Sequence, residues 1–253
     1  MSDPILKNTT SPWRSPPELI QLRHNEVHVW RAGLERPSSQ TQAFWPTLSQ
    51  EEQQRAHHFK IPIHRTHFIV ARGLLRAILS RYLLTEPHQL QIRLSPHGKP
   101  YLSTLSHEES LSLNLTHSKG LALYAISRGR EVGVDLEADR PPNFDYNRII
   151  KRILTAHEAV LFNTLSPAEQ RQAFFACWTR KEAYSKARGK GLSFPLKHIT
   201  VSFLHGEPVA LVDVQGDPGE TGRWSICELS CGPGYTAALV AAQPQWELCC
   251  WEW

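Results

Sequence analysis

Two carboxylates near the middle of the chain, Asp135 and Glu137, alternate with apolar residues between Val132 and Glu137. The alternation has strand periodicity, and residues two apart on a strand point to the same face. Close carboxylates repel each other and are costly to desolvate unless a cation or a proton lies between them. This spacing is compatible with a divalent metal site. A polar sheet face at the solvent is the simpler explanation of this stretch by itself, so the rest of the chain must decide.

A second group with the right chemistry lies further along the chain. Trp178, Glu182 and Lys186 recur every four residues and therefore share one face of a helix. A Glu four residues before a Lys is also an ordinary surface pair, which stabilises a helix by about 0.2–0.5 kcal/mol. The functional alternative makes Glu182 a third oxygen ligand, with Asp135 and Glu137, for a hard cation such as Mg²⁺. Lys186 would then bind a phosphate oxygen as a point charge.

Three further pieces could hold phosphates. Lys99 follows a tight turn at Gly98, Thr116 and His117 end a predicted strand, and Arg55 lies on a predicted helix. For each of these alone, a surface cation or a hydrogen-bonded histidine is the simpler explanation. Together with the carboxylates they describe a site for a phosphate or pyrophosphate ester.

Composition excludes several classes of protein. The 253 residues are 41% hydrophobic and 21% charged, which is ordinary for a globular protein. The formal charge of +4 suits an anionic ligand or an acidic partner, but it is too weak to indicate nucleic acid. The first ten residues lack the apolar run of a signal peptide, and no stretch approaches the length of a membrane span.

The cysteines indicate a reduced, cytoplasmic protein. Their number is odd (five), Cys249 and Cys250 are adjacent, and no zinc-binding spacing is present. His64 and His67 are neighbours on a predicted helix, but no third ligand accompanies them, so we expect no zinc site there. We also expect the protein to be a monomer without nucleic-acid or membrane partners.

The elements that must position the candidate residues follow from periodicity and from helix caps. Capping boxes begin three helices, at Ser49–Glu52, Thr155–Glu158 and Ser166–Glu169. We expect helices over residues 49–59, 62–84, 155–163 and 166–187. We expect strands over residues 27–30, 91–94, 100–102, 111–115, 121–126, 132–137, 198–204, 208–212, 224–229 and 235–241. The Trp-rich end of the chain receives no assignment.

A weak internal repeat runs through these elements. Val27–Val29 matches Val132–Val134, the capping box at Ser49 matches the one at Thr155, and the helix break at Pro62 matches Pro167, each at an offset of 105 or 106 residues. The repeat predicts an α/β (α+β) fold made of a pseudo-two-fold pair of similar halves, each a small antiparallel sheet packed with a long helix. We expect a flexible arm over residues 1–24, a first half over 25–130 and a second half over 131–253. Trp30 stands in the first half where the second has Asp135, so only the second half would carry the metal site.

At this point the residues resemble a known family. Gly133-Val134-Asp135-Leu136-Glu137, Trp178-x-x-Lys181-Glu182-x-x-x-Lys186 and Gly189-x-Gly191-Leu192 are similar to the signature of 4′-phosphopantetheinyl transferases of the Sfp type, in the holo-acyl-carrier-protein synthase superfamily. The resemblance runs from about residue 48 to 196 and includes three pieces upstream: Ser49-x-x-Glu52-x-x-Arg55, Gly98-Lys99-Pro100 and Asn114-x-Thr116-His117.

The resemblance implies an activity. Such enzymes move the 4′-phosphopantetheine arm of coenzyme A onto a serine of an acyl or peptidyl carrier protein and release 3′,5′-ADP, with coenzyme A between the two halves. The resemblance implies a set of roles as well, in which Lys186 contacts the pyrophosphate. Glu182 is our choice of general base, directly or through a metal-bound water, because it shares a helical face with Lys186. The Mg²⁺ ligands would be Asp135, Glu137 and Glu182, and the rest of coenzyme A would be bound by Arg55, Lys99, Thr116 and His117.

Some points stay open. This chain has Thr116 where the family often has Ser before the histidine, and a gap around residues 61–72 leaves the roles of Arg65, Thr66 and Arg72 undecided. The carrier is not specified either, whether of fatty-acid, polyketide or nonribosomal-peptide synthesis; residues 140–153, with Phe144 and Tyr146, are a candidate contact for an acidic carrier helix. The alternatives are a metal-dependent phosphodiesterase or nuclease, and a non-catalytic protein that binds coenzyme A or a carrier.

Overall fold

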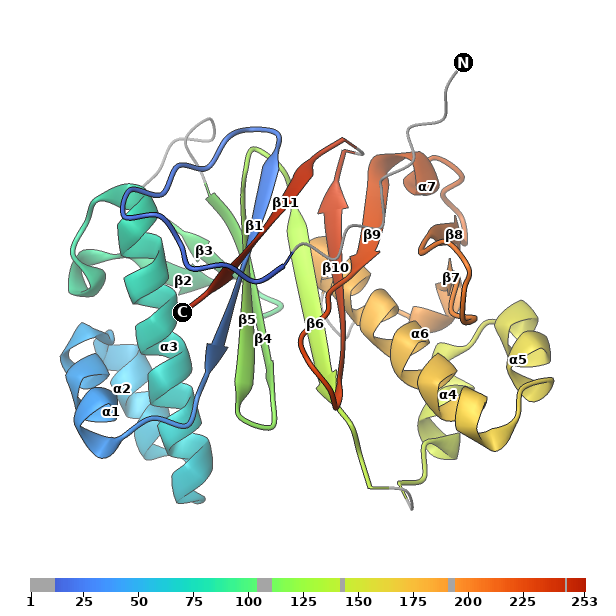
Figure 1. Ribbon diagram of the computed structural model, residues 1–253, viewed down its shortest axis with the longest axis horizontal. Coiled ribbons are helices and arrows are strands. Elements are labelled where there is room, and N and C mark those ends of the chain that lie inside the picture. The colour runs from blue at the N-terminus through green and yellow to red at the C-terminus, as the bar shows by residue number, and fades with distance from the viewer. Residues whose placement is uncertain (1–11, 104–110, 142–143, 191–193, 244) are drawn as a thin grey trace.

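The computed structural model describes residues 12–103, 111–141, 144–190, 194–243 and 245–253. Its layers follow the order helix, sheet, sheet, helix: α3 (Pro62–Leu83) covers the outer face of one sheet and α6 (Pro167–Ala187) covers the outer face of the other (Figure 1). The predicted fold class, two similar α/β halves with one long helix each, is confirmed.

The first sheet has the strand order β11-β1-β5-β4, formed by β11 (Glu247–Glu252), β1 (Glu26–Gly33), β5 (Leu121–Arg128) and β4 (Leu111–Ser118). The short helices α1 (Ser38–Phe44) and α2 (Gln50–His57) precede α3. A two-stranded ribbon of β2 (Ile92–Leu94) and β3 (Pro100–Leu102) follows it.

The second sheet has the order β6-β10-β9, with β6 (Val132–Ala138), β10 (Tyr235–Ala242) and β9 (Trp224–Glu228). The helices α4 (Asn147–Ile153) and α5 (Ala156–Asn163) lie between β6 and α6 in the chain. A ribbon of β7 (Ile199–Val201) and β8 (Leu211–Val214), and the single turn α7 (Glu220–Arg223), lie between α6 and β9. Three-residue 3₁₀ turns lie at residues 45–47, 87–89 and 196–198.

The alternation of β6 divides its residues between two environments. Val132, Val134 and Leu136 lie in a core that the two sheets share, together with Val27 and Val29 of β1. The residues that alternate with them, Gly133, Asp135 and Glu137, therefore face the opposite side, toward α6. Burial of the apolar face fixes which way the carboxylates point, because a slip of one residue would reverse the two faces.

The predicted helix starts are confirmed at all three capping boxes. Ser49, Thr155 and Ser166 each accept a hydrogen bond from the backbone N–H three residues on, and the Glu at that position bonds back to the cap. Two of these glutamates do more. Glu52 pairs with the buried Arg76 of α3 at 2.8 Å, and Glu158 pairs with the buried Lys181 of α6 at 2.5 Å. Both pairs obey the offset of the repeat, 106 residues for the acids and 105 for the bases.

The end of the chain, which the sequence analysis left unassigned, forms β11 and pairs with β1 in parallel, so the first sheet is mixed rather than wholly antiparallel. Trp251 packs against His28, and the indole N–H of Trp246 donates to Ser225 at 2.7 Å. The described part of the expected arm is held as well: Arg14 bonds with β11, and Ile20 and Leu22 are buried. The proposed division into an arm and two halves stays a prediction.

Gly133 lets β6 approach α6 more closely than any other residue type would. A Cβ atom at this position would collide with the carbonyl oxygen of Ala183 and the backbone nitrogen of Ala187. Backbone atoms of a buried helix cannot move aside cheaply, so only glycine fits. The absence of one side chain thus brings the carboxylates of β6 next to the last turn of α6.

We predict that Gly133→Ala lowers the free energy of unfolding by about 3 kcal/mol or more, because the added methyl group must push β6 away from α6. The matched control is Gly33→Ala at the end of β1, where an added Cβ meets no atom within 4 Å. Chemical denaturation of both variants measures the difference. Equal stabilities of the two variants would contradict the close-packing argument.

Candidate active site

The centre of the site is an ion pair between the two elements that Gly133 brings together. The ammonium of Lys186, in the last turn of α6, lies 2.5 Å from Asp135 Oδ1 on β6. It also donates to the carbonyl oxygen of Val134 and to the hydroxyl of Thr116, both at 3.3 Å. Asp135 is almost fully buried, at 4% exposure, so the pair is screened little by solvent.

Alternate side chains of β4 join the two sheets at this place. Asn114 Oδ1 accepts from the N–H of Val134 at 2.9 Å, the hydroxyl of Thr116 lies 3.4 Å from Asp135 Oδ1, and Ser118 Oγ accepts from the N–H of Ala138 at 3.0 Å. These contacts fix β6 against β4, so the first half positions the carboxylates of the second. The sequence analysis recognised the motif around Asn114 but missed this positioning role.

Two carboxylate oxygens at the site have no partner among the described residues. They are Asp135 Oδ2 and Glu182 Oε1, and both are buried. Buried polar atoms are normally hydrogen-bonded, so each unpartnered oxygen requires an explanation. A bound cation gives one, because hard divalent ions take carboxylate oxygens as ligands.

Burial and mutual repulsion change the acidity of these groups. Burial, followed by the charges of Asp135 and Glu137, raises the pKa of Glu182 to about 7, although Lys186 opposes the shift. Burial and the neighbouring Asp135 also raise the pKa of Glu137, which pairs with Arg140 at 3.1 Å. The carboxyls are thus close enough to influence one another.

The carboxylate oxygens of Asp135, Glu137 and Glu182 are too far apart in this structure to bind one ion together. Among the described residues, the group whose potential ligand atoms all lie within 4.8 Å of one another is a different one, at Glu26, His28 and Cys249. An ion shared by Asp135, Glu137 and Glu182 therefore requires these side chains to move closer together. Their oxygen donors and the two unpartnered atoms nevertheless fit a hard divalent cation.

A group of basic side chains lies around His117 of the first half. Burial lowers the pKa of His117, and the neighbouring His67, Lys186, Arg72 and His64 lower it further. The neutral form of the ring is therefore favoured. The Nε2 atom of His67 is buried without a partner in the described structure. Arg72 and Arg55 both lie over Phe68, with the guanidinium carbons 5.6 and 5.4 Å from the ring centre.

The remaining basic residues of the predicted site already have partners within the protein. The ammonium of Lys99 is engaged, because it lies 2.5 Å from Glu131 and 2.9 Å from the carbonyl oxygen of Ala187 at the end of α6. Arg65 bonds with His57 at 3.2 Å. Lys181, although part of the recognised motif, is fully buried and also donates to Ile153 and Leu196, so its role is structural. Gly191 and Leu192 lie outside the described residues.

A groove of about 360 Å³ opens beside the carboxylates, between α4 and α6. Glu182 and Trp178 line it from α6, in agreement with their predicted shared face, and Arg152 lines it from α4. The remaining lining residues are Ile149, Ile153, Phe194, Pro195 and Leu196. An apolar groove with a carboxylate in its wall suits a partly apolar chain whose reacting end must reach that carboxylate.

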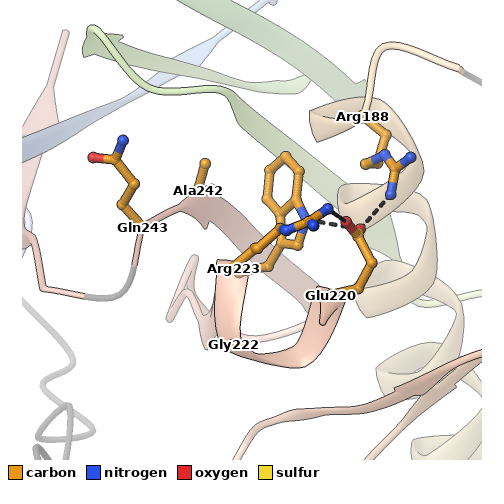
Figure 2. Close-up of a pocket in the computed structure, with 7 residues that line it drawn as sticks. Arg188, Glu220, Gly222, Arg223, Ala242 and Gln243 are labelled. Carbon is orange, nitrogen blue, oxygen red and sulfur yellow. Dashed lines mark hydrogen bonds and ion pairs between the residues drawn. The ribbon is translucent and has the colours of Figure 1, made fainter. Parts of the chain in front are cut away.

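A larger pocket, of about 530 Å³, is lined by none of these residues. In Figure 2 the side chains of Arg188 and Arg223 point toward Glu220, which is buried and also accepts hydrogen bonds from Tyr184 and Trp224. Glu220 already has four partners, so its charge is compensated by side chains of the protein and needs no ligand. It is separate from the carboxylates of β6.

The site therefore combines buried carboxylates that have unpartnered oxygens, an ammonium paired with one of them, and basic side chains from the other half. This is the arrangement of an enzyme that binds a phosphate or pyrophosphate ester with a divalent metal. A nuclease fits less well, because the Glu and Lys are four residues apart on a helix.

Comparison with known proteins identifies the family. Residues 28–128 match the family model "4′-phosphopantetheinyl transferase, N-terminal", and residues 131–240 match "4′-phosphopantetheinyl transferase superfamily". The chain is 37% identical to the 4′-phosphopantetheinyl transferase HetI of Nostoc sp. (strain PCC 7120 / SAG 25.82 / UTEX 2576), over 95% of this chain and 98% of that protein. It is 27% identical to the 4′-phosphopantetheinyl transferase Sfp of Bacillus subtilis (strain 168), over 86% of this chain and 93% of Sfp.

This chain belongs to the 4′-phosphopantetheinyl transferase family, as the resemblance in the sequence indicated. It is an enzyme that transfers the phosphopantetheine arm of coenzyme A to carrier proteins. Over the residues that the structure describes, no helix combines the length and the apolar character needed to cross a membrane.

We predict that Glu182→Gln stabilises the protein at high pH in the presence of a chelator. The Glu182 carboxyl has a pKa of about 7 in the folded state and an ordinary value near 4.5 when unfolded. Its charge therefore destabilises the fold progressively as the pH rises from about 4.5 through 7, and Gln carries no charge. The variant should be about as stable as the wild type at pH 4 and more stable by on the order of 3 kcal/mol at pH 8. Urea denaturation at several pH values measures this, and a difference that does not change with pH would contradict it.

Proposed function

We propose that this protein transfers the 4′-phosphopantetheine arm of coenzyme A to a serine of an acyl or peptidyl carrier protein in a Mg²⁺-dependent reaction that releases 3′,5′-ADP. The observation that carries the proposal is the Asp135–Lys186 ion pair, with the two unpartnered carboxylate oxygens beside it. Family membership supplies coenzyme A and a carrier protein as the substrates.

Asp135, Glu137 and Glu182 would hold the Mg²⁺, since they supply the oxygen ligands that this ion prefers. The bound metal would neutralise negative charge on the pyrophosphate of coenzyme A during the reaction. Asn114 and Gly133 act on these ligands indirectly, because they fix the backbone of β6 against β4 and α6.

The phosphates of coenzyme A would lie against the cations that surround these carboxylates. Lys186 contacts both Asp135 and Thr116, which supports the proposal that its ammonium would contact the pyrophosphate. His117, whose pKa burial lowers, would be a neutral hydrogen-bonding group there. Arg55 of α2, which lies with Arg72 over Phe68, would add positive charge. Lys99 would contribute as well, once a phosphate competes with its present partner Glu131. A point charge such as Lys binds a phosphate from many directions, which suits this shared role.

The attacking serine must lose its proton, and Glu182 is our choice of general base. Burial and the neighbouring carboxylates raise its pKa to about 7, which is in the favourable range for a base. Glu182 also lines the groove between α4 and α6, so a serine entering that groove would meet its carboxylate. The proton would pass to Glu182 as the serine oxygen bonds to phosphorus and the bond to the departing 3′,5′-ADP breaks.

The carrier would dock over α4. This helix exposes Arg148, Lys151 and Arg152 and has no acidic residue, so it favours an acidic surface on the partner. Phe144 and Tyr146, which the sequence offered as possible contacts, instead pack on the core of the second half, where Tyr146 stacks on Phe174 at 5.1 Å. We further propose that the enzyme acts as a cytoplasmic monomer.

The test is the intact mass of a carrier protein after incubation with this enzyme, coenzyme A and Mg²⁺. A panel of apo carriers from fatty-acid, polyketide and nonribosomal-peptide synthesis covers the possible partners. We expect at least one carrier to gain the mass of one phosphopantetheine arm, and we expect a chelator to abolish the gain. No mass gain on any carrier, or a gain that a chelator does not affect, would overturn the proposal.

Two variants then test the site itself. Asp135→Asn should lower the rate of transfer at least about a hundredfold, because it removes a charged metal ligand. Asp139→Asn is the matched control, since Asp139 follows the same strand but is exposed to solvent. A loss of similar size in both variants would show that Asp135 has no special role.

A further inference from the structure

A second cluster with metal-ligating chemistry lies in the first half, away from the carboxylates of β6. Glu26 and His28 are two residues apart on β1 and share one face, and Cys249 of β11 is the register partner of His28. Their potential ligand atoms all lie within 4.8 Å of one another. Glu26 and His28 are buried and Cys249 is half-buried.

We propose that Glu26, His28 and Cys249 bind a zinc ion that ties the C-terminal strand to β1. The combination of thiolate, imidazole and carboxylate is the donor set of tetrahedral zinc, whereas Mg²⁺ prefers oxygen ligands alone. Two ligands about 2.0 Å from a tetrahedral ion lie about 3.3 Å apart. His28 Nε2 and Glu26 Oε2 are 3.3 Å apart, so two of the three ligands already have the spacing that zinc needs.

The surroundings of His28 hold its ring in the orientation that zinc binding requires. Its other ring nitrogen, Nδ1, lies 2.8 Å from the hydroxyl of Tyr82, which also accepts from the indole N–H of Trp30 at 2.7 Å. The ring contacts Tyr82 and Trp251, with centroid distances of 5.7 and 5.6 Å. A metal-bound histidine typically has such a partner for its second nitrogen.

The cluster is open to solvent on the side of Cys249. Glu26 and His28 are buried, whereas Cys249 is partly exposed, so the zinc ion can enter from that side. A water molecule can reach the ion from the same side and complete its four ligands. The thiol proton leaves to solvent as the zinc–sulfur bond forms, because the thiolate is the form that binds the metal. Glu26 Oε2 also accepts from the N–H of Arg23 at 2.9 Å, which leaves it a lone pair for the metal.

The experiment uses the full chain, kept reduced and freed of metal, and titrates it with Co²⁺ as a spectroscopic substitute for zinc. We expect a thiolate-to-cobalt charge-transfer band that saturates at one ion per chain and disappears when zinc is added. Cobalt bound at the carboxylates of β6 gives no such band, because that site has no sulfur. The result is therefore independent of transferase activity.

Variants identify the ligands. Cys249→Ser should abolish the charge-transfer band, and Tyr82→Phe should weaken cobalt binding about tenfold to a hundredfold by freeing the second nitrogen of His28. Cys227→Ser is the matched control, since Cys227 is also half-buried but is not part of the cluster, and it should keep the band. If the wild type shows no band at excess Co²⁺, or if Cys249→Ser keeps it, the proposal is wrong.

A measurement on the unmodified protein guards against variants that fold poorly. We expect zinc to protect Cys249 from alkylation by iodoacetamide, as mapped by peptide mass spectrometry. We also expect zinc to raise the melting temperature of the wild type, because it binds only the paired strands. Equal alkylation of Cys249 with and without zinc would overturn the proposal.

Discussion

The contact between β6 and α6 at Gly133 is the constraint on which the site depends. Because Gly133 has no side chain, the strand lies against the backbone of Ala183 and Ala187, and Asp135 comes within 2.5 Å of the Lys186 ammonium. The other features follow from this approach. Burial at the contact raises the pKa of Glu182, and the side chains of β4 fix β6 from the other side. Carboxylates held on a strand and a helix are positioned more precisely than carboxylates on loops.

The two halves share a framework but use its central positions differently. Each has a capping-box glutamate paired with a buried cation of the long helix, Glu52 with Arg76 and Glu158 with Lys181. At the positions that match Asp135 and Lys186, the first half has Trp30 and Arg81, with the guanidinium 5.3 Å from the ring centre. A cation–π contact thus replaces the ion pair. Ala77 stands at the position that matches Glu182, so the first half lacks the acids and supplies cations instead.

The fold could be predicted from the sequence to a large extent, because capping boxes and strand alternation are local signals. The motif of Glu182 and Lys186 could be predicted for the same reason, since helical periodicity places both on one face. Contacts between distant segments gave no such signal: the pairing of β11 with β1, the role of Asn114 and the engagement of Lys99 by Glu131 depend on tertiary packing. The repeat held further information, since its offset also relates Arg76 to Lys181 and would have marked Lys181 as structural.

We propose above all that Asp135, Glu137 and Glu182 form a metal site at the contact between β6 and α6. In the loaded enzyme, Lys186 would bind a phosphate of coenzyme A. The most direct test is a crystal structure with Mn²⁺ and coenzyme A, in which anomalous scattering locates the ion. We predict an ion bonded to Asp135, Glu137 and Glu182, with the Lys186 ammonium turned from Asp135 to a phosphate oxygen. An ordered coenzyme A with no anomalous peak at these carboxylates, and with Lys186 still paired to Asp135, would contradict the account.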